Sequence, residues 1–98
     1  MNAAAYLVAL RRRASKVSDA RDPLAEARRF LATHGHTAEG TAFRKVINTL
    51  VTGHGEYRES EVWLFSQESL GLIAALIDAR TGGGYMYTTD DFRAALVK

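Results

Sequence analysis

The chain lacks cysteine altogether and has a single proline. Without cysteine there is no disulfide scaffold, no thiolate nucleophile and no cysteine-ligated zinc site. Long apolar runs are also missing, because no stretch approaches the roughly 20 residues that a membrane-spanning helix needs. We therefore expect a bacterial cytoplasmic protein with no membrane partner and no cofactor.

The material for a folded core is nevertheless present. Apolar residues make up 47% of the 98 residues, which is enough for one core and argues against general disorder. The length corresponds to one domain. Residues 1–98 are thus expected to form a single helical domain.

Helix signals dominate the first half of the chain. Apolar residues at helical spacing predict a helix over 3–17. Asp22 and Pro23 are typical of a helix start, and Gly35 is a suitable end for the second helix. The spacing of Phe43, Val46, Ile47, Leu50 and Val51 predicts a third helix, capped by Thr37 or Thr41 and ended by Gly53.

The second half predicts two more helices. Ser66 fits as the N-cap of a helix over 67–80, whose broad apolar face indicates the most buried helix. Thr88 and Asp91 fit a capping box that opens a last helix. The fold class is therefore mainly α, a compact single domain of four to five helices. A short two-stranded β ribbon, in which 61–65 pairs with 85–88, remains open because both segments are rich in β-favouring residues. Trp63 and Phe65 are expected in the core.

Charge is distributed unevenly along the chain. Residues 1–50 contain nine Lys or Arg and four acids, whereas residues 51–98 contain four and seven. If the outer faces of the first three helices combine, they form a basic surface suited to phosphates or to an acidic partner. The residues of this candidate surface are Arg11, Arg12, Arg13, Lys16, Arg28, Arg29, Arg44, Lys45 and Asn48. Thr49 is expected on the same solvent-facing arc and, like Asn48, is of a type that bonds base edges.

Histidines in two glycine-containing loops suggest a further possibility. His34 and His36 follow the second helix, while His54 and Glu56 follow the third. If the two loops meet, these side chains could bind zinc or another divalent metal. Consecutive helices usually run antiparallel, however, which would place the loops at opposite ends.

No sequence motif indicates catalysis. The serines lie outside any nucleophile-elbow pattern, and the triple glycine at 82–84 lacks the phosphate-loop signature. We therefore expect a non-enzymatic protein that acts by binding a protein partner or by self-association, with Tyr85 and Tyr87 as interface candidates. A nucleic-acid-binding regulator is the alternative, and a metal-binding protein using the histidine loops is the third hypothesis.

Overall fold

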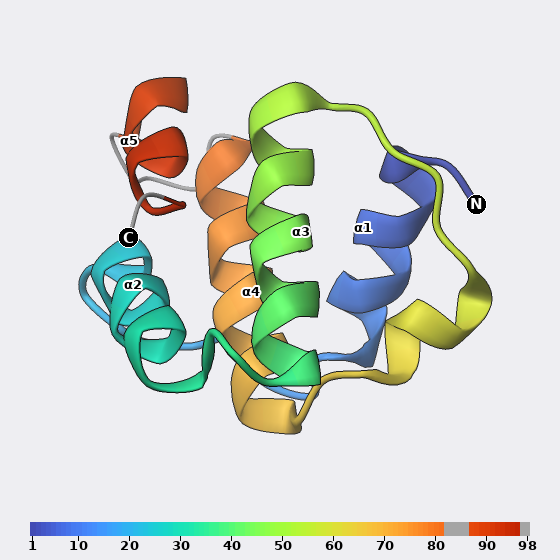
Figure 1. The fold of residues 1–98 in the computed structure, drawn as a ribbon, viewed down its shortest axis with the longest axis horizontal. Helices are drawn as coiled ribbons and strands as arrows, with labels where there is room; N and C mark the ends of the chain where they lie inside the picture. Colours follow the sequence, from blue (N-terminus) through green and yellow to red (C-terminus); the bar gives the residue numbers. More distant parts are fainter. Residues whose placement is uncertain (82–86, 97–98) are drawn as a thin grey trace.

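A helix whose middle section is apolar and buried occupies the centre of the molecule, and the other elements pack around it (Figure 1). The computed structural model describes residues 1–81 and 87–96. Within these ranges the chain forms five α-helices and one short 3-10 helix. The elements are α1 (Ala3–Arg13), α2 (Pro23–His34), α3 (Ala38–Thr52), the 3-10 helix η1 (Glu59–Trp63), α4 (Gln67–Arg80) and α5 (Thr89–Ala94). The mainly helical fold class is confirmed.

Helix starts follow the capping residues that the sequence indicates. The Asp22 carboxylate accepts a bond from the Ala25 amide and Pro23 opens α2, while the Thr37 hydroxyl caps α3. Gly53 ends α3 in the left-handed conformation, with φ of 72°. Ser66 caps α4, and a capping box at Thr88 opens α5. Local chemistry therefore fixes where most of these helices begin.

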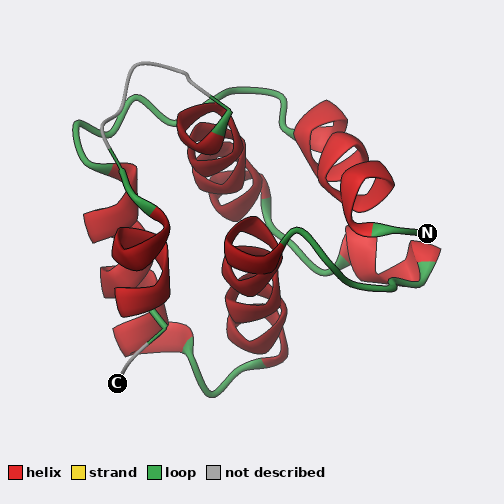
Figure 2. Cartoon of the chain, turned by 90° about the horizontal axis from the view of Figure 1, so that it is seen from above, coloured by secondary structure: helices red, strands yellow, loops and turns green. Residues whose placement is uncertain are grey.

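Burial of α4 organises the tertiary structure. Leu70, Ile73 and Leu76 have no exposed surface, and even Ser69 in the first turn is buried. Helices α1, α2 and α3 all pack against α4, and α2 also packs against α3. In Figures 1 and 2, α1 and α2 lie on opposite sides of the α3–α4 pair. The two arginine-rich segments of the first half are thereby separated.

Two glycines allow backbones to approach closely around this core. A Cβ at Gly40, on α3, would lie 1.8 Å from the His34 carbonyl oxygen at the end of α2. A Cβ at Gly71, on α4, would lie 2.7 Å from the Lys16 carbonyl oxygen, and the Ser18 amide donates to the Gly71 carbonyl at 2.9 Å. Any larger residue would push these segments apart.

The N-terminal residues pair with the connection that follows α3. The Tyr57 amide donates to the Met1 carbonyl at 2.8 Å, and Asn2 and Glu56 form an isolated antiparallel bridge. The rings of Tyr6 and Tyr57 stack with centroids 3.9 Å apart. This stack attaches the irregular connection to α1, because both aromatic rings are buried.

Two sequence predictions of local structure are wrong. The first helix ends at Arg13 rather than at 17, because the chain leaves the helix to cross α4 near Gly71. No strand occurs in the described ranges (Figure 2), and 59–63 is a 3-10 helix rather than one half of a β ribbon. Of the other half of that ribbon, residues 85 and 86 lie outside the described residues.

Replacing Gly40 by alanine tests the close approach of α2 and α3. Gly40→Ala should lower the free energy of unfolding by about 3 kcal/mol, because the new methyl group collides with a backbone carbonyl. Gly53→Ala is the matched control: its Cβ meets no atom within 4 Å, so only the left-handed backbone penalty of about 1–2 kcal/mol applies. Urea unfolding followed by circular dichroism measures both, and equal losses would contradict the packing described.

Candidate functional site

The basic residues of the sequence do not combine into one surface. Helices α1 and α2, which carry most of them, lie on opposite sides of the α3–α4 pair (Figure 1). Arg11 instead forms a two-point ion pair with Asp78 of α4, with N–O distances of 3.1 and 3.2 Å. Arg29 pairs with Glu26 one turn away on α2. Several of the predicted contact residues therefore have partners within the protein.

Three arginines donate to main-chain oxygens near the ends of other helices. Arg13 of α1 donates to Val62 in η1 at 2.7 Å, and Arg44 of α3 donates to Leu96 just beyond α5 at 2.7 Å. Arg80 of α4 donates to the Leu50 carbonyl in the last turn of α3 at 3.0 Å. Carbonyl groups at helix ends lack partners within their own helix, and cations there also interact favourably with the helix dipole.

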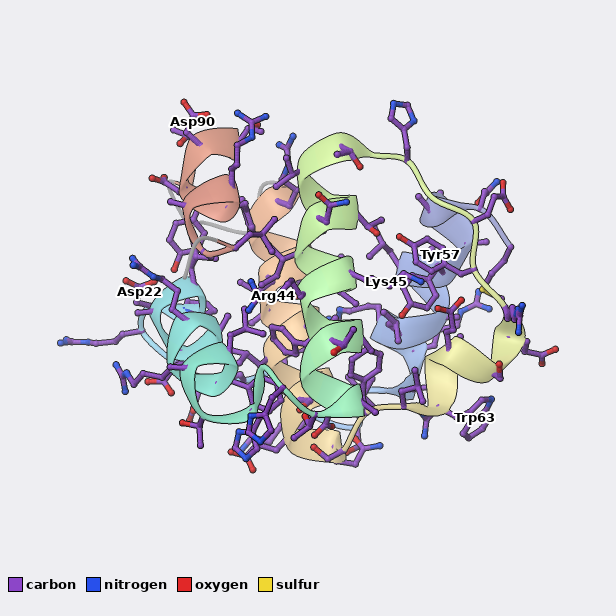
Figure 3. The ribbon with its side chains drawn as sticks, viewed as in Figure 1. Asp22, Arg44, Lys45, Tyr57, Trp63 and Asp90 are labelled. Atoms are coloured by element: carbon purple, nitrogen blue, oxygen red, sulfur yellow. The ribbon has the colours of Figure 1, made fainter. Side chains whose placement is uncertain are left out.

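Lys45 of α3 contacts the connection after that helix. Its ammonium lies 2.6 Å from Glu61 and 5.1 Å from the centre of the Tyr57 ring. The bond from Lys45 and a second bond from the Arg58 amide hold the pKa of Glu61 below its ordinary value. Figure 3 shows Lys45 and Tyr57 on the same side of α3.

The exposed arc predicted on α3 is only partly correct. Asn48 is exposed, but Thr49 is 1% exposed and its hydroxyl bonds to the Tyr57 hydroxyl. Arg12, Lys16 and Arg28 are exposed, and none has an ion pair or side-chain hydrogen bond among the described residues. These three cations are the part of the predicted basic set that is free for a partner.

The two histidine loops lie at opposite ends of α3 (Figure 1). His34 is the last residue of α2, where it stacks on Phe30 at 4.8 Å, and His36 lies in the connection to α3, whereas His54 and Glu56 follow the other end of α3. Within 1–81 and 87–96, no group of three or more His, Asp or Glu side chains could hold a metal ion. The four predicted ligands are therefore not brought together, because the 15 residues of α3 separate the two loops.

Of the two tyrosines predicted to form an interface, only Tyr87 is within the described residues. Tyr85 lies outside the described residues. Tyr87 is half-buried: its hydroxyl donates to the Asp22 carboxylate and accepts from the Leu24 amide at 3.3 Å. The bond from Tyr87 lowers the pKa of Asp22. Tyr87 thus joins the segment before α5 to the start of α2.

Trp63, expected in the core, is instead the most exposed large apolar side chain among the described residues. It is 67% exposed, and the neighbouring Leu64 is 43% exposed. The guanidinium of Arg13 lies over the indole, 4.0 Å from the ring centre. Figure 3 shows Trp63 projecting from η1 away from the helices. We call the residues Arg13, Trp63 and Leu64 the Trp63 surface.

The 3-10 geometry of η1 explains this exposure. Val62 and Phe65 are buried, so the two residues between them face solvent. Glu61 accepts from the Arg58 amide at 2.7 Å, which satisfies a donor at the start of η1. The acids at 59 and 61, suited to a helix start, were a sequence signal for this turn, but the apolar run 62–65 obscured it.

Further bonds fix the position of this turn against α1. The Gln67 side chain donates to the Arg13 carbonyl at 3.0 Å and accepts from the Ser15 amide at 3.0 Å. Helix α1 also packs directly against η1. The Trp63 surface is therefore built on two elements that are joined to each other.

Comparisons with protein-family models, with curated proteins and with solved structures give no match for this chain. Among the described helices, none combines the length and apolar character needed to cross a bilayer.

Stability should depend on pH through Glu61. Its pKa is lower in the folded state than the ordinary value of 4.5, so its stabilising contribution is complete above that pH. The contribution is lost as the pH falls through the lower, folded value. Glu61→Gln should cost about 1 kcal/mol or less at pH 7, and this difference from wild type should vanish in strong acid. Urea unfolding at several pH values measures it; a difference independent of pH would contradict the Lys45 contact.

Arg13 should restrict the motion of the only tryptophan in the chain. Arg13→Gln removes the cation–π contact, so the fluorescence anisotropy of Trp63 should fall while its emission stays that of an exposed indole. We also expect a loss of about 1–2 kcal/mol in unfolding free energy, from the bond to Val62. Arg12→Gln, an exposed arginine of the same helix, is the control and should leave the anisotropy unchanged. An unchanged anisotropy in Arg13→Gln would rule out the restriction.

Proposed function

We propose that this protein is a non-catalytic binding module that recognises a protein partner through the Trp63 surface. The observation that carries the proposal is an exposed tryptophan held in place by an arginine of another helix. The neighbouring Leu64 is exposed as well, and adjacent exposed apolar side chains that form a patch can mark contact sites for other proteins. We also propose a cytoplasmic location, since a chain without cysteine cannot be a disulfide-stabilised secreted scaffold.

The residue types of the Trp63 surface support protein recognition. Tryptophan and arginine are enriched among the residues that dominate interface energies. A side chain that is already ordered loses less entropy on binding than one that moves freely. The contact from Arg13 and the attachment of η1 to α1 supply such order. A partner can therefore bury the indole at a small entropic cost.

Charge near this surface indicates the chemistry of the partner. Arg12, in the last turn of α1, and Lys16, three residues after that helix ends, are exposed and close to Arg13 in sequence. We propose a partner segment that places a bulky apolar side chain against Trp63 and has acidic residues beside it. The cations would then accelerate association and select against basic partners. A second copy of this chain is the alternative occupant.

Selection from a random peptide library tests this proposal. Peptides selected on the wild-type protein and counter-selected on Trp63→Ala should combine acidic residues with a bulky apolar residue. Their affinity should fall roughly 30-fold or more with Trp63→Ala, because the indole is the central contact. Val8→Ala is the matched control, since Val8 is an exposed apolar residue of α1 that lies outside the Trp63 surface.

Three outcomes would change this assignment. Selected peptides that bind Trp63→Ala as tightly as wild type would overturn it. Concentration-dependent dimers in light scattering, lost in Trp63→Ala, would identify a second copy as the occupant. Salt-sensitive binding of nonspecific duplex DNA that survives Trp63→Ala would favour the nucleic-acid alternative instead.

A further inference from the structure

A cavity of about 560 Å³ lies between α2, α3 and the end of α5, and no sequence pattern predicts it. Its volume is within the usual range of small-molecule sites. Polar and apolar side chains both line it. The lining residues are Arg28, Leu31, Ala32, Gly35, His36, Arg44 and Ala95.

Two guanidinium groups give the cavity its chemistry. Arg28 of α2 has no ion pair or side-chain hydrogen bond among the described residues. Arg44 of α3 donates one Nη1 bond to the Leu96 carbonyl, and its remaining N–H groups have no described acceptor. Arginine presents several donors in a planar fork that matches a carboxylate. The cavity therefore offers unused donors for an anion.

Two acids that share a depression with Arg28 already have other partners. Asp22 and Asp91 line an adjoining depression together with Arg28. The Asp22 carboxylate accepts from the Tyr87 hydroxyl and the Ala25 amide. The Asp91 carboxylate accepts from the Thr88 amide at 2.8 Å. Neither acid forms an ion pair with Arg28, so the cation is not neutralised at this position.

We propose that this cavity binds an aliphatic monocarboxylate, with its carboxylate at Arg28 and Arg44 and its chain against Leu31, Ala32 and Ala95. The apolar wall distinguishes this ligand from a small inorganic anion, which would leave that wall in contact with water. The paired arginines distinguish it from an uncharged chain, which would leave their donors unused.

This site is independent of the Trp63 surface. The cavity lies between α2, α3 and α5, whereas Trp63 projects from η1 on the other side of the molecule (Figure 3). Failure of one proposal therefore leaves the other intact.

Titration of the ¹⁵N-labelled protein with sodium octanoate tests the proposal. Shift changes should concentrate in the amides of the second half of α2, Gly35, His36 and Ala95. Arg28→Gln should weaken binding roughly tenfold or more, since a charge-assisted pair is lost. Arg12→Gln, an equally exposed arginine of α1, should leave the affinity unchanged. Inorganic phosphate and 1-octanol should each bind much more weakly than octanoate.

A second variant keeps the test decisive if changes at the arginines disturb the fold. Ala32 is exposed on α2, so Ala32→Glu should preserve the helix and place a repelling carboxylate at the cavity. It should abolish octanoate binding without altering the unfolding transition. Unchanged affinity in Ala32→Glu or in Arg28→Gln, shifts scattered over the molecule, or equal binding of phosphate or 1-octanol would each overturn the proposal.

Discussion

Burial of the middle of α4, from Ser69 to Leu76, governs how the other helices are arranged. A helix that is apolar around its circumference must be covered by its neighbours, and in this fold α1, α2 and α3 cover it. Because α4 must be covered from several directions, α1 and α2 lie on opposite sides of the α3–α4 pair. The glycine at 71 lets the connection between them cross α4 closely. The packing around α4 therefore determines which charged side chains can come into contact.

Arginine contributes more to holding this fold together than to forming a basic face. Arg13, Arg44 and Arg80 each bond a carbonyl near the end of another helix, while Arg11 joins α1 to α4. The excess of positive charge in the first half of the sequence therefore has a structural explanation for several residues. Arg28 is an exception, because it lines a cavity and has no ion pair among the described residues.

Helix positions could be predicted from sequence because caps act within one turn. Asp22, Thr37, Ser66 and Thr88 each bond an amide three residues ahead, so a short stretch of sequence contains the whole signal. The exposure of Trp63 could not be predicted in this way. An apolar run is compatible with a strand or a core segment, and only packing against α1 decides which side chains face inward.

The mainly helical character of the chain, most of the helix starts, the central helix and the uneven distribution of charge all follow from the order of the amino acids. Which residues act together depends on how the helices pack. This packing separates the histidine loops and the arginines of α1 and α2, and it places Arg28 beside Arg44 and Arg13 over Trp63. Helix formation depends on residues that are close in sequence. A site, in contrast, depends on which side chains are brought together when helices pack to cover one another's apolar surfaces.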